Sequence, residues 1–351
     1  MSGEISRADA KGASDRPAES EPSTDEGTQA SGQVGPGDIL SAVMAKMSGP
    51  GFPGSVASNV WHYTTADGLL GILESNHIWA SAPQVLNDES EVEYGVAIVR
   101  EALAQLEHEQ VLPGHALELL HEIVDDGWVE RMQSKVFVTS TSHDGDSLNQ
   151  WQGYANADGF ALSFDTTGRW GTRSVLAEDG RPSSTGLPTM FTPVIADWYP
   201  VIYDRPAQLL QARDALLWNG AMVSGVDGEP LSRENRSRAA SSARLMLSVI
   251  PLVMKHPAFV DEREVRYVGG ATDQQVRFRT SGGRVIPYTV LGLLDPSKQI
   301  NQDDARFPLT AITCGPGCRP GTADIVKRLL SSHSYDHVPV ITSSIPYLGR
   351  G

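Results

Sequence analysis

Residues 60–82, VWHYTTADGLLGILESNHIWASA, place two strand patterns on either side of a helical pattern. The first five residues favour a strand, and a helix opens at Thr65 with apolar residues recurring three and four positions apart. The second strand pattern ends at Ser81. His62 and Tyr63 stand together in the first strand. His62 is either a hydrogen-bonded core histidine or part of a site, and only the rest of the chain can distinguish these interpretations.

Strand patterns continue along the chain and alternate irregularly with helical ones. The predicted helices cover residues 92–106, 115–132, 146–158, 206–256 with a break at SGVDGEP, and 322–330. The later predicted strands are 136–142, 161–165, 198–204, 264–268, 275–279, 284–294, 309–315 and 338–344. Because helices do not regularly separate the strands, we expect an α+β domain over residues 57–351, with a mixed, mostly antiparallel sheet flanked by helices.

The first 56 residues differ in composition from the rest. Residues 1–36 are Ser, Gly, Ala, Glu, Asp and Pro with almost no apolar surface to bury, so we expect a disordered acidic and polar tail. Residues 37–56 combine a short amphipathic helix with a linker, MSGPGFPGS, that breaks it. Further on, Asp88 and Glu91 have the spacing of a capping box before the helix 92–106.

Charge and hydropathy limit the classes of partner. The chain has 351 residues, a net charge of -15 and a pI near 5.0. These values argue against a global attraction to nucleic acid or anionic lipid but leave a local basic patch open. No run approaches the roughly 18 apolar residues of a membrane helix. The first residues lack the apolar segment of a secretory signal, so we expect a cytoplasmic location.

Metal sites and several common catalytic motifs find no support. The two cysteines, Cys314 and Cys318 in CGPGC, complete neither a zinc site nor a disulfide framework. The nine histidines are scattered without ligand spacing, so we expect no metal. The chain also lacks G-x-G-x-x-G after a strand, a Walker A motif, H-E-x-x-H and G-x-S-x-G.

Three polar clusters carry the candidate chemistry, and the first is His62-Tyr63-Thr64. In a strand, His62 and Thr64 face one way and Tyr63 faces the other. A neutral histidine offers one donor and one acceptor, which suits a ribose hydroxyl, and Thr64 would assist. A buried histidine without a ligand is the alternative.

The second cluster spans the strand 136–142 and the helical pattern after it. Hydroxyl side chains, among them Ser140, gather at the end of the strand. Trp151 and Tyr154 lie three residues apart on one predicted helical face, where two aromatic rings could stack a flat heterocycle. Ordinary core packing explains the same spacing.

The third cluster is DEREVRYV, residues 261–268. Glu262, Glu264 and Arg266 alternate, so a strand would place all three on one face. Two carboxylates beside an arginine form a possible acid/base or charge-stabilising device. The alternative is a solvated edge strand with cross-strand salt bridges.

Taken together, these segments resemble the bacterial DUF2971 family, whose name records an unknown function. The matching segments are HYTTADGLLGILESNHIWAS (62–81), LNDESE (86–91), VFVTSTS (136–142), SLNQWQGYANADGFALSFD (147–165), PVIYD (200–204), KHPAFVDEREVRYV (255–268), CGPG (314–317) and SSIPYL (343–348). One departure lies in LNDESE, where the family usually has proline after the Asn-Asp pair.

A second resemblance concerns the fold. A strand with a leading histidine, a helix of the L-x-x-I-L type and a short strand resemble the start of an ADP-ribosyltransferase-type fold. That fold uses a histidine on the first strand, an aromatic residue on a later element and a glutamate at the start of a late strand. In this order the chain offers His62, then Tyr154 or Trp151, then Glu264 or Glu262.

This resemblance implies an enzyme that uses NAD as a substrate. It would be an ADP-ribosyltransferase with an unknown acceptor (protein, nucleic acid or small molecule) or an NAD glycohydrolase, functions suited to stress or phage defence. The implied catalytic residues are Glu264 and Glu262, since a carboxylate near the ribose stabilises an oxocarbenium-like charge. The implied binding residues are His62, Tyr63, Thr64, Ser140, Trp151, Tyr154 and Arg266.

Two other functions stay open. The same pocket would serve a sensor that binds a nucleotide or another ligand without turnover. Glu262 or Glu264 would also serve as the general base of a hydrolase of another kind.

Overall fold

The computed structural model describes residues 58–85, 90–125, 127–128, 135–172, 196–224, 232–293 and 306–347. The chain divides into two units, Met1–Val34 and Gly35–Gly351, and every described residue belongs to the second. The predicted tail 1–36, the helix and linker 37–56, and Asp88 of the predicted capping box lie outside the described residues.

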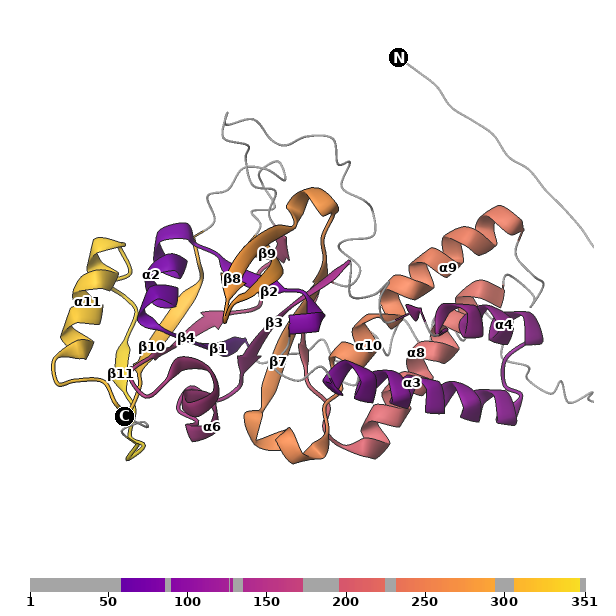
Figure 1. Ribbon diagram of the computed structural model, residues 1–351, viewed down its shortest axis with the longest axis horizontal. Helices are drawn as coiled ribbons and strands as arrows, with labels where there is room; N and C mark the ends of the chain where they lie inside the picture. Colours follow the sequence, from indigo (N-terminus) through magenta and orange to yellow (C-terminus); the bar gives the residue numbers. More distant parts are fainter. Residues whose placement is uncertain are drawn as a thin grey trace, which may run out of the picture. The chain divides into compact units, whose positions relative to one another are not determined.

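The described strands form one eleven-stranded sheet (Figure 1). Its order is β11-β10-β4-β1-β3-β2-β9-β5, with β7 beside β3, β6 beside β7 and β8 beside β9. Among the paired strands, β10 and β11 are parallel and the other pairs are antiparallel, which confirms the predicted mixed, mostly antiparallel α+β sheet. The strands are β1 Asn59–Thr64, β2 Ile78–Ser81, β3 Val136–Ser142, β4 Phe160–Asp165, β5 Trp170–Thr172, β6 Asp197–Pro200, β7 Glu264–Gly270, β8 Arg277–Ser281, β9 Arg284–Leu293, β10 Leu309–Cys314 and β11 Val340–Thr342.

Two groups of helices bury two separate cores against the sheet (Figure 1). The first group packs on β3 and β7 and contains α3 Ser90–Glu109, α4 Gly114–Ile123, α8 Arg205–Ser224, α9 Arg233–Leu247 and α10 Val249–Leu252. The second group packs near β1, β4 and β10 and contains α2 Ala66–Ser75 and α11 Thr322–Ser332. A short helix, α6 Leu148–Gln150, continues into a π-helical turn at Trp151–Ala155.

Three elements differ from the sequence-based expectation. The helix predicted to reach residue 132 ends at Ile123. The strand predicted over 198–204 is limited to Asp197–Pro200, and the chain then leaves β7, because Ile202 forms an isolated bridge with Met254 instead. The third difference is that β7 is central: β3 pairs with one edge and β6 with the other, and all its residues are buried. A solvated edge strand was therefore the wrong alternative for the third cluster.

The sheet is divided at β3, and this division positions the site. One edge of β3 pairs with β7 from Val136 to Ser142. The other edge pairs with β1 at Ser142 and with β2 at Val138, so two different strands share it. Meanwhile β1 pairs with β4 over its full length. The sheet therefore opens beside Ser140, between β1 and β2.

Gly95 allows α3 to approach α10 closely. A Cβ atom at Gly95 would lie 2.3 Å from the Pro251 carbonyl oxygen and 2.6 Å from its Cα atom. Since those atoms belong to the backbone, we expect Gly95→Ala to lower the free energy of unfolding by about 1–3 kcal/mol, as measured by urea denaturation. Gly71→Ala is the matched control because nothing lies within 4 Å of its Cβ position. Equal stability of the two variants would contradict this close packing.

Candidate functional site

A cavity of about 40 Å³ lies at the opening in the sheet. It is lined by Trp61, His62, Tyr63, Ser140, Thr141, Gln150, Tyr154, Glu262 and Glu264. These residues come from β1, from β3, from the helical turn after β3, and from the segment that enters β7. Each of the three polar clusters found in the sequence therefore contributes to one cavity.

His62 reaches across the opening between β1 and β3. Its Nδ1 atom lies 3.4 Å from the Ser140 carbonyl oxygen. Burial lowers the pKa of His62, although the bond to Ser140 opposes this shift, so the neutral ring is favoured. A carbonyl oxygen can only accept, so Nδ1 carries the hydrogen in this contact and Nε2 is left as an acceptor.

The helical turn after β3 brings Tyr154 and Gln150 to the cavity, whereas Trp151 packs into the core. Trp151 is fully buried, contacts the Tyr63 ring edge-on at 4.7 Å and donates from Nε1 to Asp146 at 2.9 Å. Tyr154 keeps more than a third of its surface exposed. The predicted shared face is therefore wrong, because the turn is π-helical rather than α-helical and residues three apart diverge.

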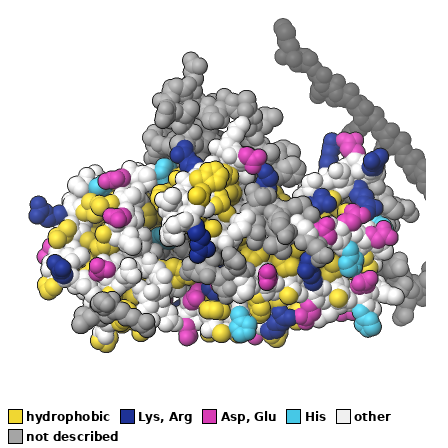
Figure 2. Space-filling view, viewed as in Figure 1, with side chains coloured by type: hydrophobic (Ala, Val, Ile, Leu, Met, Phe, Trp, Pro, Cys, Tyr) yellow, Lys and Arg dark blue, Asp and Glu magenta, His cyan; other side chains and the backbone are white. Residues whose placement is uncertain are grey.

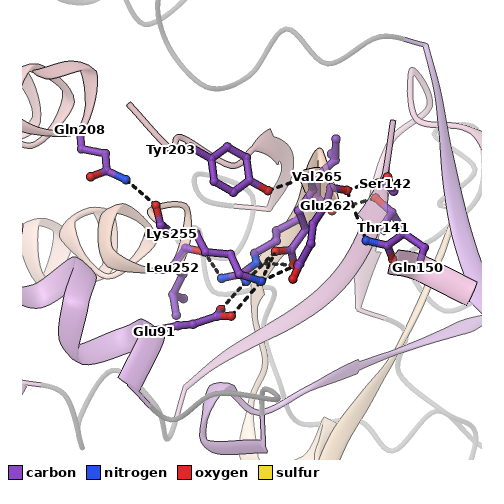
Figure 3. A network of polar contacts seen from close by, with 12 residues as sticks. Glu91, Thr141, Ser142, Gln150, Tyr203, Gln208, Leu252, Lys255, Glu262 and Val265 are labelled. Carbon is purple, nitrogen blue, oxygen red and sulfur yellow. Dashed lines mark hydrogen bonds and ion pairs between the residues drawn. The ribbon is translucent and has the colours of Figure 1, made fainter. Parts of the chain in front are cut away.

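Two cations and three carboxylates form a buried network behind the cavity (Figure 3). The Arg266 guanidinium donates from Nε to Glu264 Oε1 at 2.7 Å and from Nη2 to Glu91 Oε2 at 2.6 Å. The Lys255 ammonium lies 2.8 Å from Glu91, 2.6 Å from Glu262 and 3.3 Å from Glu264. In Figure 3 the Glu91 carboxylate reaches this cluster from α3.

Glu262 and Glu264 meet in this network by a route that the sequence did not predict. Glu262 ends a short 3₁₀ helix, Pro257–Glu262, and only Glu264 begins β7. Between them Arg263 has a φ of 45°, in the left-handed region. This turn, rather than strand alternation, brings both carboxylates to Lys255.

The environment separates the pKa values of the two glutamates. For Glu264, burial acts to raise the pKa, but the charges of Arg266 and Lys255 outweigh it and hold the pKa at about 2. For Glu262, burial is the largest effect and raises the pKa, with Lys255 opposing it. The Glu262 side chain is 19% exposed and that of Glu264 is 4% exposed. Glu264 is therefore a fixed anion of the network, and Glu262 is the more exposed of the two carboxylates that line the cavity.

The predicted site residues divide into three groups. His62, Tyr63, Ser140, Tyr154, Glu262 and Glu264 line the cavity. Arg266 lies behind the cavity, where it pairs with Glu264 and Glu91. Thr64 and Trp151 are absent from the cavity lining. Tyr63 has a structural task as well, since its hydroxyl donates to Asp144 O at 2.8 Å and accepts from Ser147 N at 2.9 Å.

Sequence reasoning missed Lys255 and misjudged Glu91. Lys255 follows an apolar helix and is 3% exposed. A lysine between an apolar run and the Glu-Arg-Glu motif was the available signal. Glu91 was considered only for a capping box with Asp88, which lies outside the described residues, and its carboxylate is buried and pairs with Lys255 and Arg266. Tyr203, also missed, accepts a hydrogen bond from the Glu264 backbone N–H at 3.0 Å.

Within the described ranges, no group of three or more His, Cys, Asp or Glu side chains is arranged to hold a metal ion. None of the described helices is both long and apolar enough to cross a membrane.

The comparisons with known proteins identify one family. Residues 150–267 match the DUF2971 family, described as a protein of unknown function. No curated protein and no solved structure matches the chain. The match covers a narrower span than the motifs from His62 to Leu348 indicated, but it contains Tyr154 and the segment that enters β7. Residues 150–267 are therefore a DUF2971 family domain, and Lys255, Glu262 and Glu264 all lie within it.

Proposed function

We propose that the cavity is the active site of an enzyme that cleaves the bond between nicotinamide and ribose in NAD. ADP-ribose would pass to an acceptor or to water. The observation that carries this proposal is the convergence of His62, Tyr154 and Glu262 at the opening of the sheet beside Ser140. A histidine, an aromatic ring and a carboxylate are the groups that hold a ribose, stack a heterocycle and stabilise positive charge.

The charge balance of the buried network supports the proposal. Glu91, Glu262 and Glu264 face two cations, so one negative charge is in excess when all five groups are ionised. Departure of nicotinamide leaves positive charge on the ribose, which a fixed carboxylate stabilises. Because Glu262 is the more exposed of the two cavity glutamates, we assign this task to Glu262.

His62 and Tyr154 would bind the reacting end of the substrate. With Nδ1 directed to Ser140, the Nε2 atom of neutral His62 is available to accept from a ribose hydroxyl. The exposed ring of Tyr154 would stack on nicotinamide. A cavity of about 40 Å³ is far smaller than the about 300–1,000 Å³ that encloses a whole ligand. The remainder of the dinucleotide would therefore lie outside the cavity mouth.

The test is nicotinamide release from NAD by the purified full-length protein, followed by chromatography in buffer and in cell extract. Release in buffer alone indicates a glycohydrolase. Release that requires extract indicates a transferase that needs its acceptor. No release in either condition, at a protein concentration comparable to that of NAD, would contradict the proposal.

A nucleotide sensor without turnover is the second candidate, and one observation favours it. Both oxygens of Glu264 are engaged by Arg266, and one of them also contacts Lys255, as in a structural ion pair. A sensor would bind NAD or a related nucleotide in calorimetry and release no nicotinamide. Glu262→Gln would then change the affinity alone.

A further inference from the structure

A face rich in arginine and aromatic side chains lies on β2, β8 and β9. Cross-strand partners share a face of a sheet, and residues two apart along a strand share it as well. The pairings Arg277↔Tyr288, Tyr288↔Ser81 and Ser281↔Arg284 therefore place these side chains on one side. Trp79 lies two residues before Ser81 on β2, and Arg279 lies two residues after Arg277 on β8, so both side chains point to the same side. We define Trp79, Arg277, Arg279, Arg284 and Tyr288 as the arginine–aromatic face.

The Trp79 ring of this face is half exposed and contacts two neighbouring side chains. Trp79 is 52% exposed, and its ring lies 4.9 Å from that of Tyr288. The Arg279 guanidinium sits 5.4 Å from the centre of the Trp79 ring and donates to Ser81 Oγ at 3.3 Å. The Trp79 ring is half exposed, and a cation–π contact fixes its orientation. It therefore offers a preformed stacking surface.

The charge of the face contrasts with that of the whole chain. The described strands β2, β8 and β9 contain three arginines and no carboxylate, while the chain carries a net charge of -15. Figure 2 shows hydrophobic side chains close to Lys or Arg side chains in the region where Figure 1 draws the β8–β9 hairpin. A positive strip with an exposed tryptophan ring complements a phosphate backbone with unstacked bases.

The arginine–aromatic face leads to the cavity. Ser81 pairs with Val138, and Ser140 of the cavity lining follows two residues later on the same side of β3. From Arg284 to the residue opposite Trp79, the face extends about 20 Å along β9, at about 3.4 Å per residue. A ligand lying along the face would therefore reach the opening beside Ser140.

We propose that the arginine–aromatic face binds single-stranded nucleic acid and that this strand is the acceptor; the second clause rests on the function proposed above. In the transfer, the bond from ribose C1′ to nicotinamide breaks and nicotinamide leaves with the electron pair. An oxygen or nitrogen of the strand bonds to C1′, and its proton passes to the Glu262 carboxylate or to water. Trp79 stacks a base, and Arg277 and Arg284 contact phosphates.

Binding is tested first, without NAD, by fluorescence anisotropy of the full-length protein with labelled 20-nucleotide DNA and RNA single strands at 50–200 mM salt. Trp79→Ala should weaken binding about 5- to 150-fold, the loss expected for one stacked base. Arg277→Ala with Arg284→Ala should flatten the slope of log affinity against log salt by about 1.4, at about 0.7 per phosphate contact.

Phe278→Ala is the matched control, because Phe278 lies on the opposite side of the same hairpin and is 69% exposed. It should leave the affinity unchanged. Three results would overturn the inference. They are the absence of strand binding at 50 mM salt, a loss of affinity in Phe278→Ala equal to that in Trp79→Ala, and binding to polyglutamate as tight as to the nucleic-acid strands. The DNA and RNA arms show which strand is preferred.

Transfer is tested separately, with labelled NAD and the bound oligonucleotide. If the wild type labels the oligonucleotide and Trp79→Ala does not, the result supports both strand binding by the face and the role of the strand as acceptor. Nicotinamide release without nucleic-acid binding overturns this inference and leaves the proposed function standing. Strand binding without any nicotinamide release overturns both the proposed enzyme activity and the role of the strand as acceptor. The proposal that the face binds a single strand would remain supported.

Discussion

Replacing Arg266 by methionine is expected to lower the free energy of unfolding by about 3–5 kcal/mol, the cost of breaking a buried ion pair by removing one partner. Arg266 is 2% exposed and neutralises Glu264 and Glu91, which are 4% and 7% exposed. Methionine fills a similar volume but leaves three carboxylates with Lys255 as their one cation in the network. Equilibrium urea unfolding at neutral pH measures the loss.

The matched control is Arg213→Met on α8. Arg213 makes a two-pronged contact with Glu109, at 2.9 and 2.5 Å, but at the surface. Surface pairs contribute little because solvent screens them, so the stability of the control should stay close to that of the wild type. If Arg266→Met gives no folded protein, Arg266→Lys retains the charge without the planar fork and should be intermediate. If Arg266→Met loses less unfolding free energy than Arg213→Met, the buried network does not stabilise the fold as expected.

The same variant has a signature in pH. Because the pKa of Glu264 is held at about 2, below its ordinary value of 4.5, this group stabilises the fold above pH 4.5. That contribution is lost as the pH falls from 4.5 towards 2. Without the guanidinium the pKa of Glu264 rises, so acid unfolding of Arg266→Met should begin at a higher pH than in the wild type, as followed by circular dichroism.

The second large effect is expected for Glu262→Gln, which should reduce nicotinamide release about 10²- to 10³-fold, the loss found when one preorganised electrostatic group is removed. Glutamine keeps the shape and a hydrogen bond but cannot carry the negative charge that we propose stabilises the ribose cation. Since burial raises the pKa of Glu262, the wild-type rate should also fall on the acid side at a pH above 4.5, the ordinary value for this group.

Asp261→Asn is the matched control, since it makes the same change one residue away on an exposed side chain of the same 3₁₀ helix. It should leave the rate unchanged, and both variants should retain folded spectra. Glu264→Gln should instead lose stability, because Glu264 is a fixed partner of Arg266. Equal rates of nicotinamide release for Glu262→Gln and the wild type would contradict the catalytic role assigned to Glu262.

Local patterns in the sequence were sufficient for the elements of the divided sheet. The residues of β1, α2 and β2 follow from apolar spacing within 23 residues, and the strand around Val265 from alternation. The same reasoning found His62, Tyr154 and the two glutamates as candidates, because they belong to three short clusters of polar, aromatic and charged residues. Trp151 was misplaced because spacing of three residues assumes α-helical geometry, and the turn is π-helical.

The sequence by itself determined which residue types were available, their order and the α+β class, because these depend on contacts between near neighbours. Tertiary structure decided how the environments of the two glutamates differ. Arg266 holds Glu264, Lys255 pairs most closely with the more exposed Glu262, and Glu91 joins them from a helix far away in the chain. The pKa of a buried group depends on desolvation and on the charges within a few ångströms. Those neighbours are set by how strands and helices pack, and no local pattern in the sequence specifies them.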